Sequence, residues 1–142
     1  LTWLGIHWLD LAMFVTDSPI VSVAGFTGNV GGQPIGVEDS VAVVMRFENG
    51  IFGTLTSGYY LDKGSQSHLK IWGEKGRIEI DSGQPAVVTI YGAEPAVTEI
   101  ERPEDFDPYR DFIGAAVRAS MGQGEPPITG EESLRVLKAV YG

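Results

Sequence analysis

The sequence has 142 residues, of which 43% are hydrophobic and 20% are charged, as in soluble globular domains with a packed core. Its formal net charge of −9 argues against binding to nucleic acid or to an anionic membrane, because these surfaces are also negative. The chain has no cysteine, which excludes disulfides, thiolate nucleophiles and thiolate-bound zinc and fits a cytoplasmic protein.

The first predicted element is a helix over residues 4–15. Apolar residues lie on all of its sides, which predicts a helix that is covered on most of its surface. Residues 16–19 end it, because Pro19 cannot continue a helix. The segment is shorter than the roughly 20 residues of a membrane span and lacks the basic start of a signal peptide. We therefore expect a domain from a longer chain.

Strands follow, each indicated by alternating or β-branched residues. The predicted strands are residues 20–30, 40–48, 51–60, 68–73, 77–81, 86–92 and 96–101. Asn49-Gly50 predicts a hairpin with a type I′ turn, because both residue types accept a positive φ. Pairing of consecutive strands gives a mainly antiparallel sheet with a meander.

Two helices are predicted to end the chain, over residues 108–121 and 129–142. Asp107 is a suitable N-cap for the first, with Pro108 as its first residue. Thr129 and Glu132 have the spacing of a capping box at the start of the second. An apolar stripe is expected along the second helix. It consists of Leu134, Leu137 and Val140.

The resulting fold class is α+β, an open and mainly antiparallel sheet with helices packed on one face. One side of the strand over residues 40–48 carries Val41, Val43, Met45 and Phe47, and the other carries Ala42, Val44 and Arg46. The helix-free face must be solvated or meet another sheet, which makes it a candidate dimer face. Apolar residues on both sides leave two possibilities: one face is covered, or both are.

His7 and Asp10 are the first candidate site residues, since their i, i+3 spacing puts them on one helix face, with Trp3 one turn earlier. An imidazole can relay a proton near neutral pH. The alternative is that His7 only forms a hydrogen bond in the core or to Asp10. Tyr59, at the end of a predicted strand, could line a sugar pocket, and ordinary sheet packing is its alternative.

Other chemistry finds no support in the sequence. Two histidines that are 61 positions apart, without clustered carboxylates, do not predict a metal site. Adjacent acids such as Glu38 and Asp39 are interpreted as solvated turn charges. The glycines of residues 28–32 follow a strand but precede no helix, so no dinucleotide site is predicted.

The chain resembles the C-terminal domain of the glucose–fructose oxidoreductase/inositol dehydrogenase (Gfo/Idh/MocA) family. Gly5, His7 and Asp10 match that family's helix pattern D-x-G-x-H-x-x-D. The similarity continues in "SPIVSVAG", "VEDSVAVVMRFENGIFGTLTSGY", "IWGEKGRIEID" and "PPITGEESLRVLKAVYG", in the family's order. Trp3 stands where the family often has an aspartate, and an indole accepts no proton there, although it can stack on a sugar face.

The resemblance implies a substrate-binding and oligomerisation domain over residues 1–142 of a longer NAD(P)-dependent oxidoreductase. NAD or NADP would be bound by an N-terminal Rossmann domain that is absent from this chain, so the fragment alone is expected to be inactive. The substrate would be a sugar, a cyclitol or a related polyol, and the open sheet face would form a homo-oligomer.

By position, His7 matches the family's active-site histidine and is expected to exchange a proton with a substrate hydroxyl. Asp10 is expected to orient it, and Trp3 and Tyr59 to contact substrate. Two alternatives remain: a binding or scaffolding relative without redox turnover, and a relative that cleaves glycosides or acts as a lyase with NAD assistance.

Overall fold

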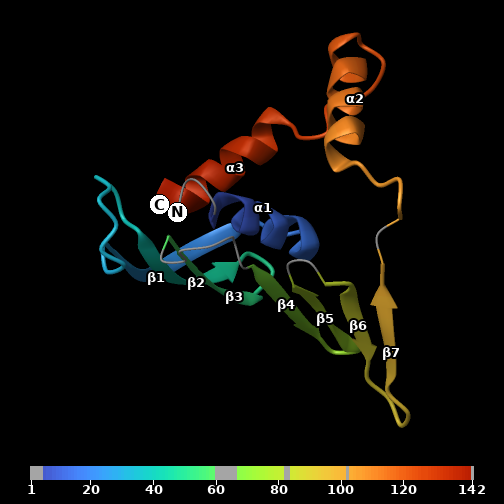
Figure 1. The fold of residues 1–142 in the computed structure, drawn as a ribbon, viewed down its shortest axis with the longest axis horizontal. Coiled ribbons are helices and arrows are strands. Elements are labelled where there is room, and N and C mark those ends of the chain that lie inside the picture. The colour runs from blue at the N-terminus through green and yellow to red at the C-terminus, as the bar shows by residue number, and fades with distance from the viewer. Residues whose placement is uncertain (1–4, 60–66, 82–83, 102, 142) are drawn as a thin grey trace. The chain divides into compact units, whose positions relative to one another are not determined.

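The structure is a computed structural model that describes residues 5–59, 67–81, 84–101 and 103–141 (Figure 1). In chain order, its elements are α1 (Gly5–Thr16), β1 (Ile20–Gly28), β2 (Ser40–Phe47), β3 (Phe52–Gly58), β4 (His68–Gly73), β5 (Gly76–Asp81), β6 (Ala86–Ile90), β7 (Ala96–Ile100), α2 (Pro108–Ser120) and α3 (Gly130–Tyr141). Each predicted helix and strand is thus confirmed, with small differences at the ends.

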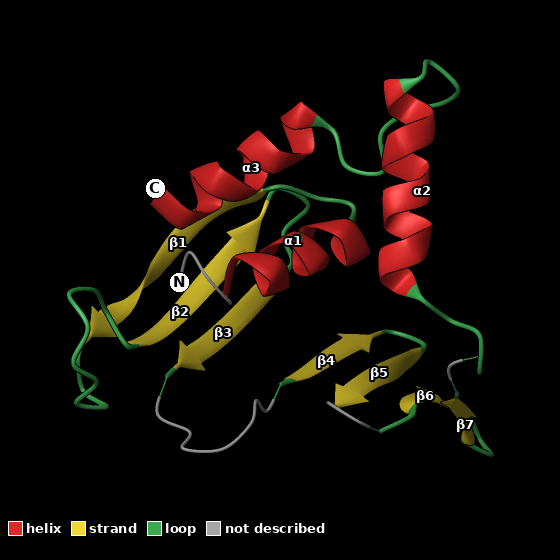
Figure 2. Cartoon of the chain, turned by 45° about the horizontal axis from the view of Figure 1, so that its top comes forward, coloured by secondary structure: helices red, strands yellow, loops and turns green. Residues whose placement is uncertain are grey.

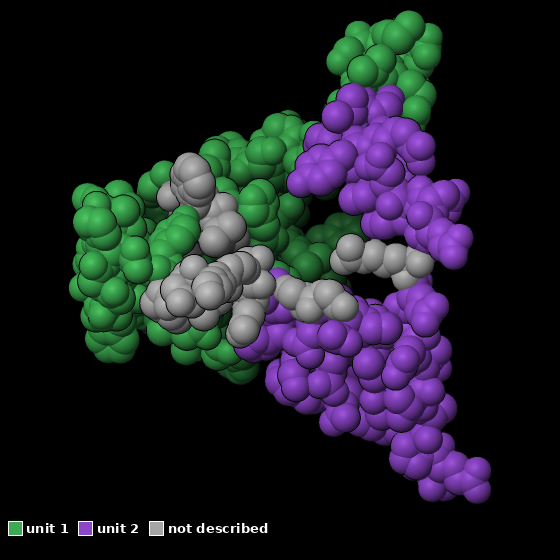
Figure 3. All heavy atoms as spheres, viewed as in Figure 1, with its two compact units in different colours: residues 1–61, 115–142 green, residues 62–114 purple. Residues whose placement is uncertain are grey.

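The strands form two antiparallel sheets, in the orders β1-β2-β3 and β4-β5-β6-β7 (Figure 2). The α+β fold class and the pairing of consecutive strands within each sheet are confirmed. The expected meander is divided after β3 in the described part of the chain. Two compact units result, residues 1–61 with 115–142 and residues 62–114 (Figure 3).

The core of the first unit lies between the sheet β1-β2-β3 and two helices. α1 contacts β3, α3 contacts β1, and the helices contact each other. Alternate residues of β2 face the helices, as the sequence predicts. The buried core residues are Leu9, Met13, Val41, Val43, Met45, Phe47 and Val136. Residues from both ends of the described chain therefore close one core.

The first unit's described residues leave the opposite face of this sheet uncovered. The β2 residues between the core positions are exposed, and Val44 has 55% of its surface accessible. Phe26 on β1 and Phe52 on β3 share this face and are 85% and 73% exposed. Of the two possibilities for the sheet faces, cover by this chain's own helices thus applies to one face only.

Helix α1 is buried along one stripe, half-buried beside that stripe, and exposed at His7, Phe14 and Val15, so the predicted cover on most sides is confirmed only in part. Its buried residues are Gly5, Leu9 and Met13, one turn apart along a single stripe. Phe14 and Val15 are exposed. The all-round apolar composition therefore includes an outer strip that no described residue buries.

A Schellman motif ends α1. The Ser18 N–H donates to the Met13 carbonyl and the Asp17 N–H to the Phe14 carbonyl, both over 3.3 Å. Asp17 adopts the left-handed conformation that this motif requires, with φ 46°. The helix thus stops before Pro19, which follows the cap without having to break the helix.

The hairpin of β2 and β3 is confirmed, but its type I′ turn is wrong. Phe47 N–H donates to the Ile51 carbonyl over 2.9 Å, so three residues form the loop. Only its last residue, Gly50, has a positive φ, of 90°, whereas a type I′ turn also needs one at Asn49. The Asn49 amide instead donates to the Thr16 carbonyl over 3.1 Å, which fixes the loop to the end of α1.

The predicted caps of α2 and α3 are both present. Asp107 accepts a hydrogen bond from the Arg110 N–H over 3.1 Å. Thr129 N–H donates to the Glu132 carboxylate over 2.7 Å, and Glu132 N–H returns a bond to the Thr129 hydroxyl over 3.2 Å. These bonds from Thr129 hold the Glu132 pKa below its usual value.

The core-facing stripe of α3 differs from the expected one. Val136 is buried and Val140 packs against the core, one turn apart. Leu134 and Leu137 are exposed. Periodicity alone could not choose between the two stripes, because apolar residues occur on both.

In the second unit, a small charge network joins β4 to β5. Lys70 and Arg77 both contact the Glu79 carboxylate, over 2.7 and 2.9 Å. The hydrogen bond from Lys70 holds the Glu79 pKa below its usual value. Because these side chains are partly exposed, the ion pairs add little to stability. Their main effect is to favour the observed register of β4 against β5.

Candidate functional site

His7 lies on the outer face of α1 and its side chain is exposed. The residues that bury the helix, Gly5 and Leu9, lie two positions to either side of it, about half a turn around the axis. His7 is therefore not the core histidine that the sequence left open. Asp10, one turn later, is half-buried at the margin of the same outer face.

The direction of α1 determines which end of the sheet His7 approaches. A turn of three residues, Asp17 to Pro19, separates α1 from β1, and the two elements run in opposite directions (Figures 1 and 2). The first half of α1 therefore lies toward the sheet end where β1 ends, at Gly28. In register, Gly28 pairs with Ser40.

Tyr59 belongs to this same end, directly after β3. Its N–H donates to the carbonyl of Asp39 over 2.9 Å, and its side chain is 36% exposed. An exposed tyrosine can offer both a ring face and a hydroxyl to a ligand. Trp3, the fourth predicted site residue, lies outside the described residues.

Asp39 is the residue that sequence reasoning misjudged. Its prediction as a solvated turn charge is wrong, because only 1% of its surface is exposed. Its carboxylate accepts hydrogen bonds from the Val30 and Gly31 N–H groups over 2.9 and 3.1 Å. It also accepts from the Gln33 N–H over 3.3 Å and the Ser40 hydroxyl over 2.7 Å. One signal in the sequence could have indicated this role: the aspartate stands directly between a glycine-rich loop and a strand.

These hydrogen bonds keep Asp39 ionised. Burial by itself raises the carboxyl pKa, since it disfavours the charged form. The bonds from Ser40 and from the loop N–H groups outweigh burial and hold the Asp39 pKa below its usual value. The ionised Asp39 carboxylate therefore holds the loop in place through several hydrogen bonds.

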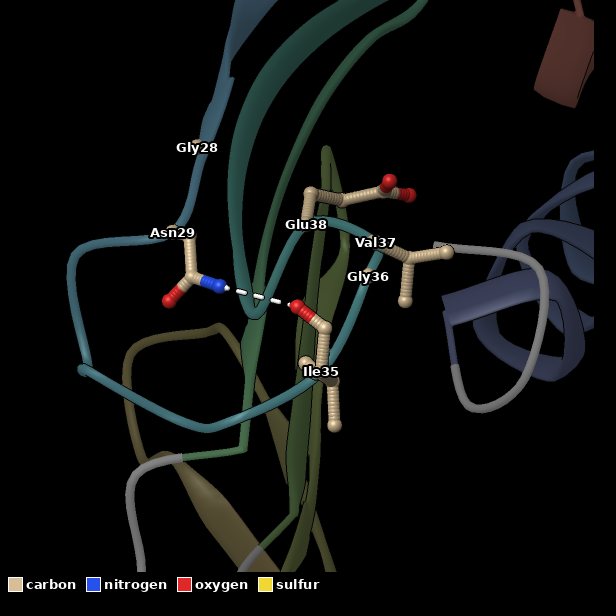
Figure 4. A pocket seen from close by; sticks show the side chains of 6 residues that line it. All are labelled: Gly28, Asn29, Ile35, Gly36, Val37 and Glu38. Carbon is tan, nitrogen blue, oxygen red and sulfur yellow. Dashed lines mark hydrogen bonds between the residues drawn. The ribbon is translucent and has the colours of Figure 1, made fainter.

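An open pocket of about 530 Å³ lies against this loop (Figure 4). It is lined by Gly28, Asn29, Ile35, Gly36, Val37 and Glu38. The lining combines an amide and a carboxylate with two aliphatic side chains. Its volume is within the range of small-molecule sites.

The described residues do not form a dinucleotide-binding fold. Every strand pairing among them is antiparallel, whereas a dinucleotide fold needs parallel strands joined by a helix. Nor does the described part of the chain gather three His, Asp or Glu side chains in a group that could hold a metal ion. Within the same residues, no helix is long and apolar enough to cross a membrane.

Comparison with protein families gives a match over residues 1–79 to the model described as the GFO/IDH/MocA C-terminal domain. This covers more than half of the chain and includes α1, the sheet β1-β2-β3 and β4. Comparison with curated protein sequences gives no match.

Several solved structures share the fold. A UDP-N-acetylglucosamine 3-dehydrogenase from Acidithiobacillus ferrooxidans matches with TM-score 0.81 and 18% identity, over 94% of this chain and 44% of that one. An oxidoreductase domain protein from Kribbella flavida matches with TM-score 0.81 and 17% identity, over 97% and 45%. An aldose-aldose oxidoreductase from Caulobacter crescentus, complexed with glycerol, matches with TM-score 0.77 and 23% identity, over 96% and 41%. The chain thus spans less than half the length of each.

Proposed function

Because the chain belongs to the GFO/IDH/MocA family of oxidoreductases, through that family's C-terminal domain, we propose that it is the substrate-binding and oligomerisation domain of an NAD(P)-dependent enzyme. The proposed substrate is a sugar, a cyclitol or a related polyol. The similar structures include a nucleotide-sugar dehydrogenase and an aldose oxidoreductase, which supports this class. The observation that carries the proposal is the exposed His7 of α1, opposite the buried stripe of that helix.

His7 is proposed as the proton relay. When a secondary alcohol becomes a ketone, the carbon loses a hydride and the oxygen loses a proton. A neutral imidazole that forms a hydrogen bond with the hydroxyl can accept this proton and return it in the reverse direction. Asp10, one turn away at the margin of the same face, is proposed to orient the ring. Trp3 and Tyr59 remain proposed substrate contacts.

The cofactor is proposed to be NAD or NADP, which supplies the hydride chemistry. Since the described residues form no dinucleotide-binding fold, we place the cofactor on a Rossmann domain outside this chain. The uncovered outer face of α1, with His7 and Phe14, is consistent with a neighbour that completes the site. The chain alone is then expected to have no oxidoreductase activity.

The open face of the sheet β1-β2-β3 is proposed to contact a second copy of the protein. The exposed side chains of Phe26, Val44 and Phe52 lie on adjacent strands of this face. Solvent exposure of such neighbouring apolar side chains is costly, and a homo-oligomer would remove them from water.

The test uses the full-length protein that carries this domain. Polyols, aldoses and nucleotide sugars are screened for NAD(P) reduction, and the best substrate is then tested with His7→Ala. We expect kcat to fall by about 10²- to 10⁴-fold, the usual contribution of a positioned acid or base. Lys138→Ala, an exposed change on α3, is the control and should retain most activity. Unchanged turnover in His7→Ala would refute the relay, and no turnover with any substrate would refute the redox proposal.

A further inference from the structure

The loop between β1 and β2, residues 29–38, is fastened by polar side chains at both of its ends. At the far end, the buried Asp39 carboxylate binds the N–H groups of Val30, Gly31 and Gln33. At the near end, the Asn29 amide donates to two loop carbonyls, those of residues 33 and 35, over 3.2 and 3.3 Å (Figure 4). These hydrogen bonds hold the loop in the conformation that the structure shows.

This order matters for binding because a flexible loop loses conformational entropy when a ligand fixes it. The bonds that fix the loop are intramolecular, and the Asp39 carboxylate is removed from solvent. A ligand in the adjacent pocket does not have to order the loop. Such prior ordering lowers the entropic cost of binding a ligand at this loop.

The pocket beside the loop has the chemistry of a polyol site. Polyols present hydroxyl groups, which both donate and accept hydrogen bonds, along with apolar C–H faces. The Asn29 side chain carries an acceptor oxygen beside its donor amide, and Glu38 adds a carboxylate to the lining. The aliphatic side chains of Ile35 and Val37 complete the lining and suit the C–H faces.

The position of the pocket connects it to the proposed substrate contacts. Asp39 accepts the Tyr59 N–H at its carbonyl and donates its own N–H to the Gly28 carbonyl over 3.1 Å. One buried residue thus joins the loop, the end of β1 and Tyr59. The first half of α1, with His7, lies toward this same end of the sheet (Figure 1).

We propose that the loop of residues 29–38 forms a polyol-binding edge of the substrate site, and that Asp39 is the positioning residue that holds it in the binding conformation. This inference rests on the proposed function for the identity of the substrate. It adds a part of the site that no predicted residue supplied. Asp39 acts through the loop and contacts no substrate itself.

The test measures both kinetics and loop protection in the full-length protein. Asp39→Asn removes a carboxylate oxygen that accepts loop N–H groups, and Asn29→Ala alters the pocket from the exposed end without touching the core. We expect each change to raise KM for the polyol about tenfold while kcat stays within twofold. In the wild type, the polyol should slow hydrogen–deuterium exchange of peptides that cover residues 29–38. Asp81→Asn, an exposed aspartate of β5, is the matched control and should change neither quantity.

The outcomes separate this inference from the function on which it rests. If Asp39→Asn lowers thermal stability but both variants keep the wild-type KM, the loop is only structural and the inference is overturned. If the wild type turns over no polyol, the redox proposal fails, and hydrogen–deuterium exchange alone tests the loop. Protection of residues 29–38 by glycerol or myo-inositol then supports the polyol-binding edge. Absence of this protection overturns the inference.

Discussion

The side-chain amide of Asn49 donates a hydrogen bond to the carbonyl oxygen of Thr16 over 3.1 Å, which joins the β2–β3 hairpin loop to the last residue of α1. The Asn49 side-chain oxygen accepts the Ile51 N–H over 3.2 Å, and its backbone N–H donates to the Ser18 hydroxyl over 3.1 Å. The position of α1 on its sheet is thus fixed at one end by hydrogen bonds and along its length by the core.

Replacement of Asn49 should therefore destabilise the first unit. We expect Asn49→Ala to lower the free energy of unfolding by about 1–2 kcal/mol, for the loss of two hydrogen bonds at an exposed position. Urea denaturation followed by circular dichroism measures this. Asn49→Asp keeps the oxygen that accepts from Ile51 and loses the donor to Thr16, so it should fall between wild type and Asn49→Ala. Equal stability of all three proteins would contradict the role of this bond.

The left-handed Asp17 predicts a stabilising substitution. With φ 46° at the C-terminal cap of α1, Asp17 has a conformation that costs an ordinary side chain energy and costs glycine little. We expect Asp17→Gly to raise the free energy of unfolding by about 0.5–1 kcal/mol. This figure already subtracts the opposing effect of glycine's greater conformational entropy in the unfolded chain. Asp17→Asn, which also tolerates this conformation, should change it little. A loss of stability in Asp17→Gly would mean that the aspartate side chain supports the cap.

At Gly25 on β1 we expect the opposite effect, because replacement of this glycine by a larger residue should destabilise the protein. A Cβ at this position would overlap the carbonyl oxygen of Ala42 and the side chain of Val43, 2.7 Å away. We expect Gly25→Ala to lower the free energy of unfolding by about 1–3 kcal/mol, because the β1–β2 pair must shift. Gly36→Ala is the matched control, since no atom lies within 4 Å of its added carbon. Equal melting temperatures of the two variants would show that β1 is free to move.

The ionised Asp39 predicts how stability depends on pH. Its folded pKa is lower than the unfolded value of about 3.9, so its stabilising contribution is complete above that pH and is lost as pH falls through the folded pKa. We expect the urea midpoint of the wild type to fall below about pH 4. Asp39→Asn should be less stable at pH 7 and show a shallower fall in acid, whereas Asp81→Asn should follow the wild type. Parallel pH curves for wild type and Asp39→Asn would contradict this account.

The open sheet face predicts self-association that a single charge can prevent. Val44 lies on the central strand of the first sheet and is exposed, so Val44→Glu would bury a carboxylate in any contact across this face. We expect sedimentation of the full-length protein to show an oligomer for the wild type and a smaller species for Val44→Glu. Val97→Glu places the same change at an exposed position of β7 and should leave the oligomer intact. A monomeric wild type at high concentration would refute the contact.

Local patterns in the sequence predicted the elements because each one depends on a few neighbouring residues. The strand with Val41 and Phe47 buries its alternate side chains as expected, and Thr129 with Glu132 forms its capping box. The type I′ turn failed because the Asn49 side chain binds Thr16, more than 30 positions away, and such a long-range partner leaves no local pattern.

The site could be predicted only in part for the same reason. The exposure of His7 depends on which face of α1 the sheet covers, and an all-round apolar sequence does not specify that face. The role of Asp39 depends on where the chain of residues 30–33 turns, because its partners are backbone N–H groups and carry no side-chain signal. Hydrogen bonds to the backbone are therefore the part of a site that composition and spacing reveal least.

The contact between α1 and α3 has a consequence for how the chain acquires its structure during synthesis. Leu9 leaves the ribosome long before Val136, although both residues belong to the same core. Until α3 is made, one flank of that core stays open to water, while the whole β4–β7 sheet emerges in between. We therefore expect the first unit to remain a substrate for chaperones until α3 has been synthesised, and the second to fold before it as an insertion.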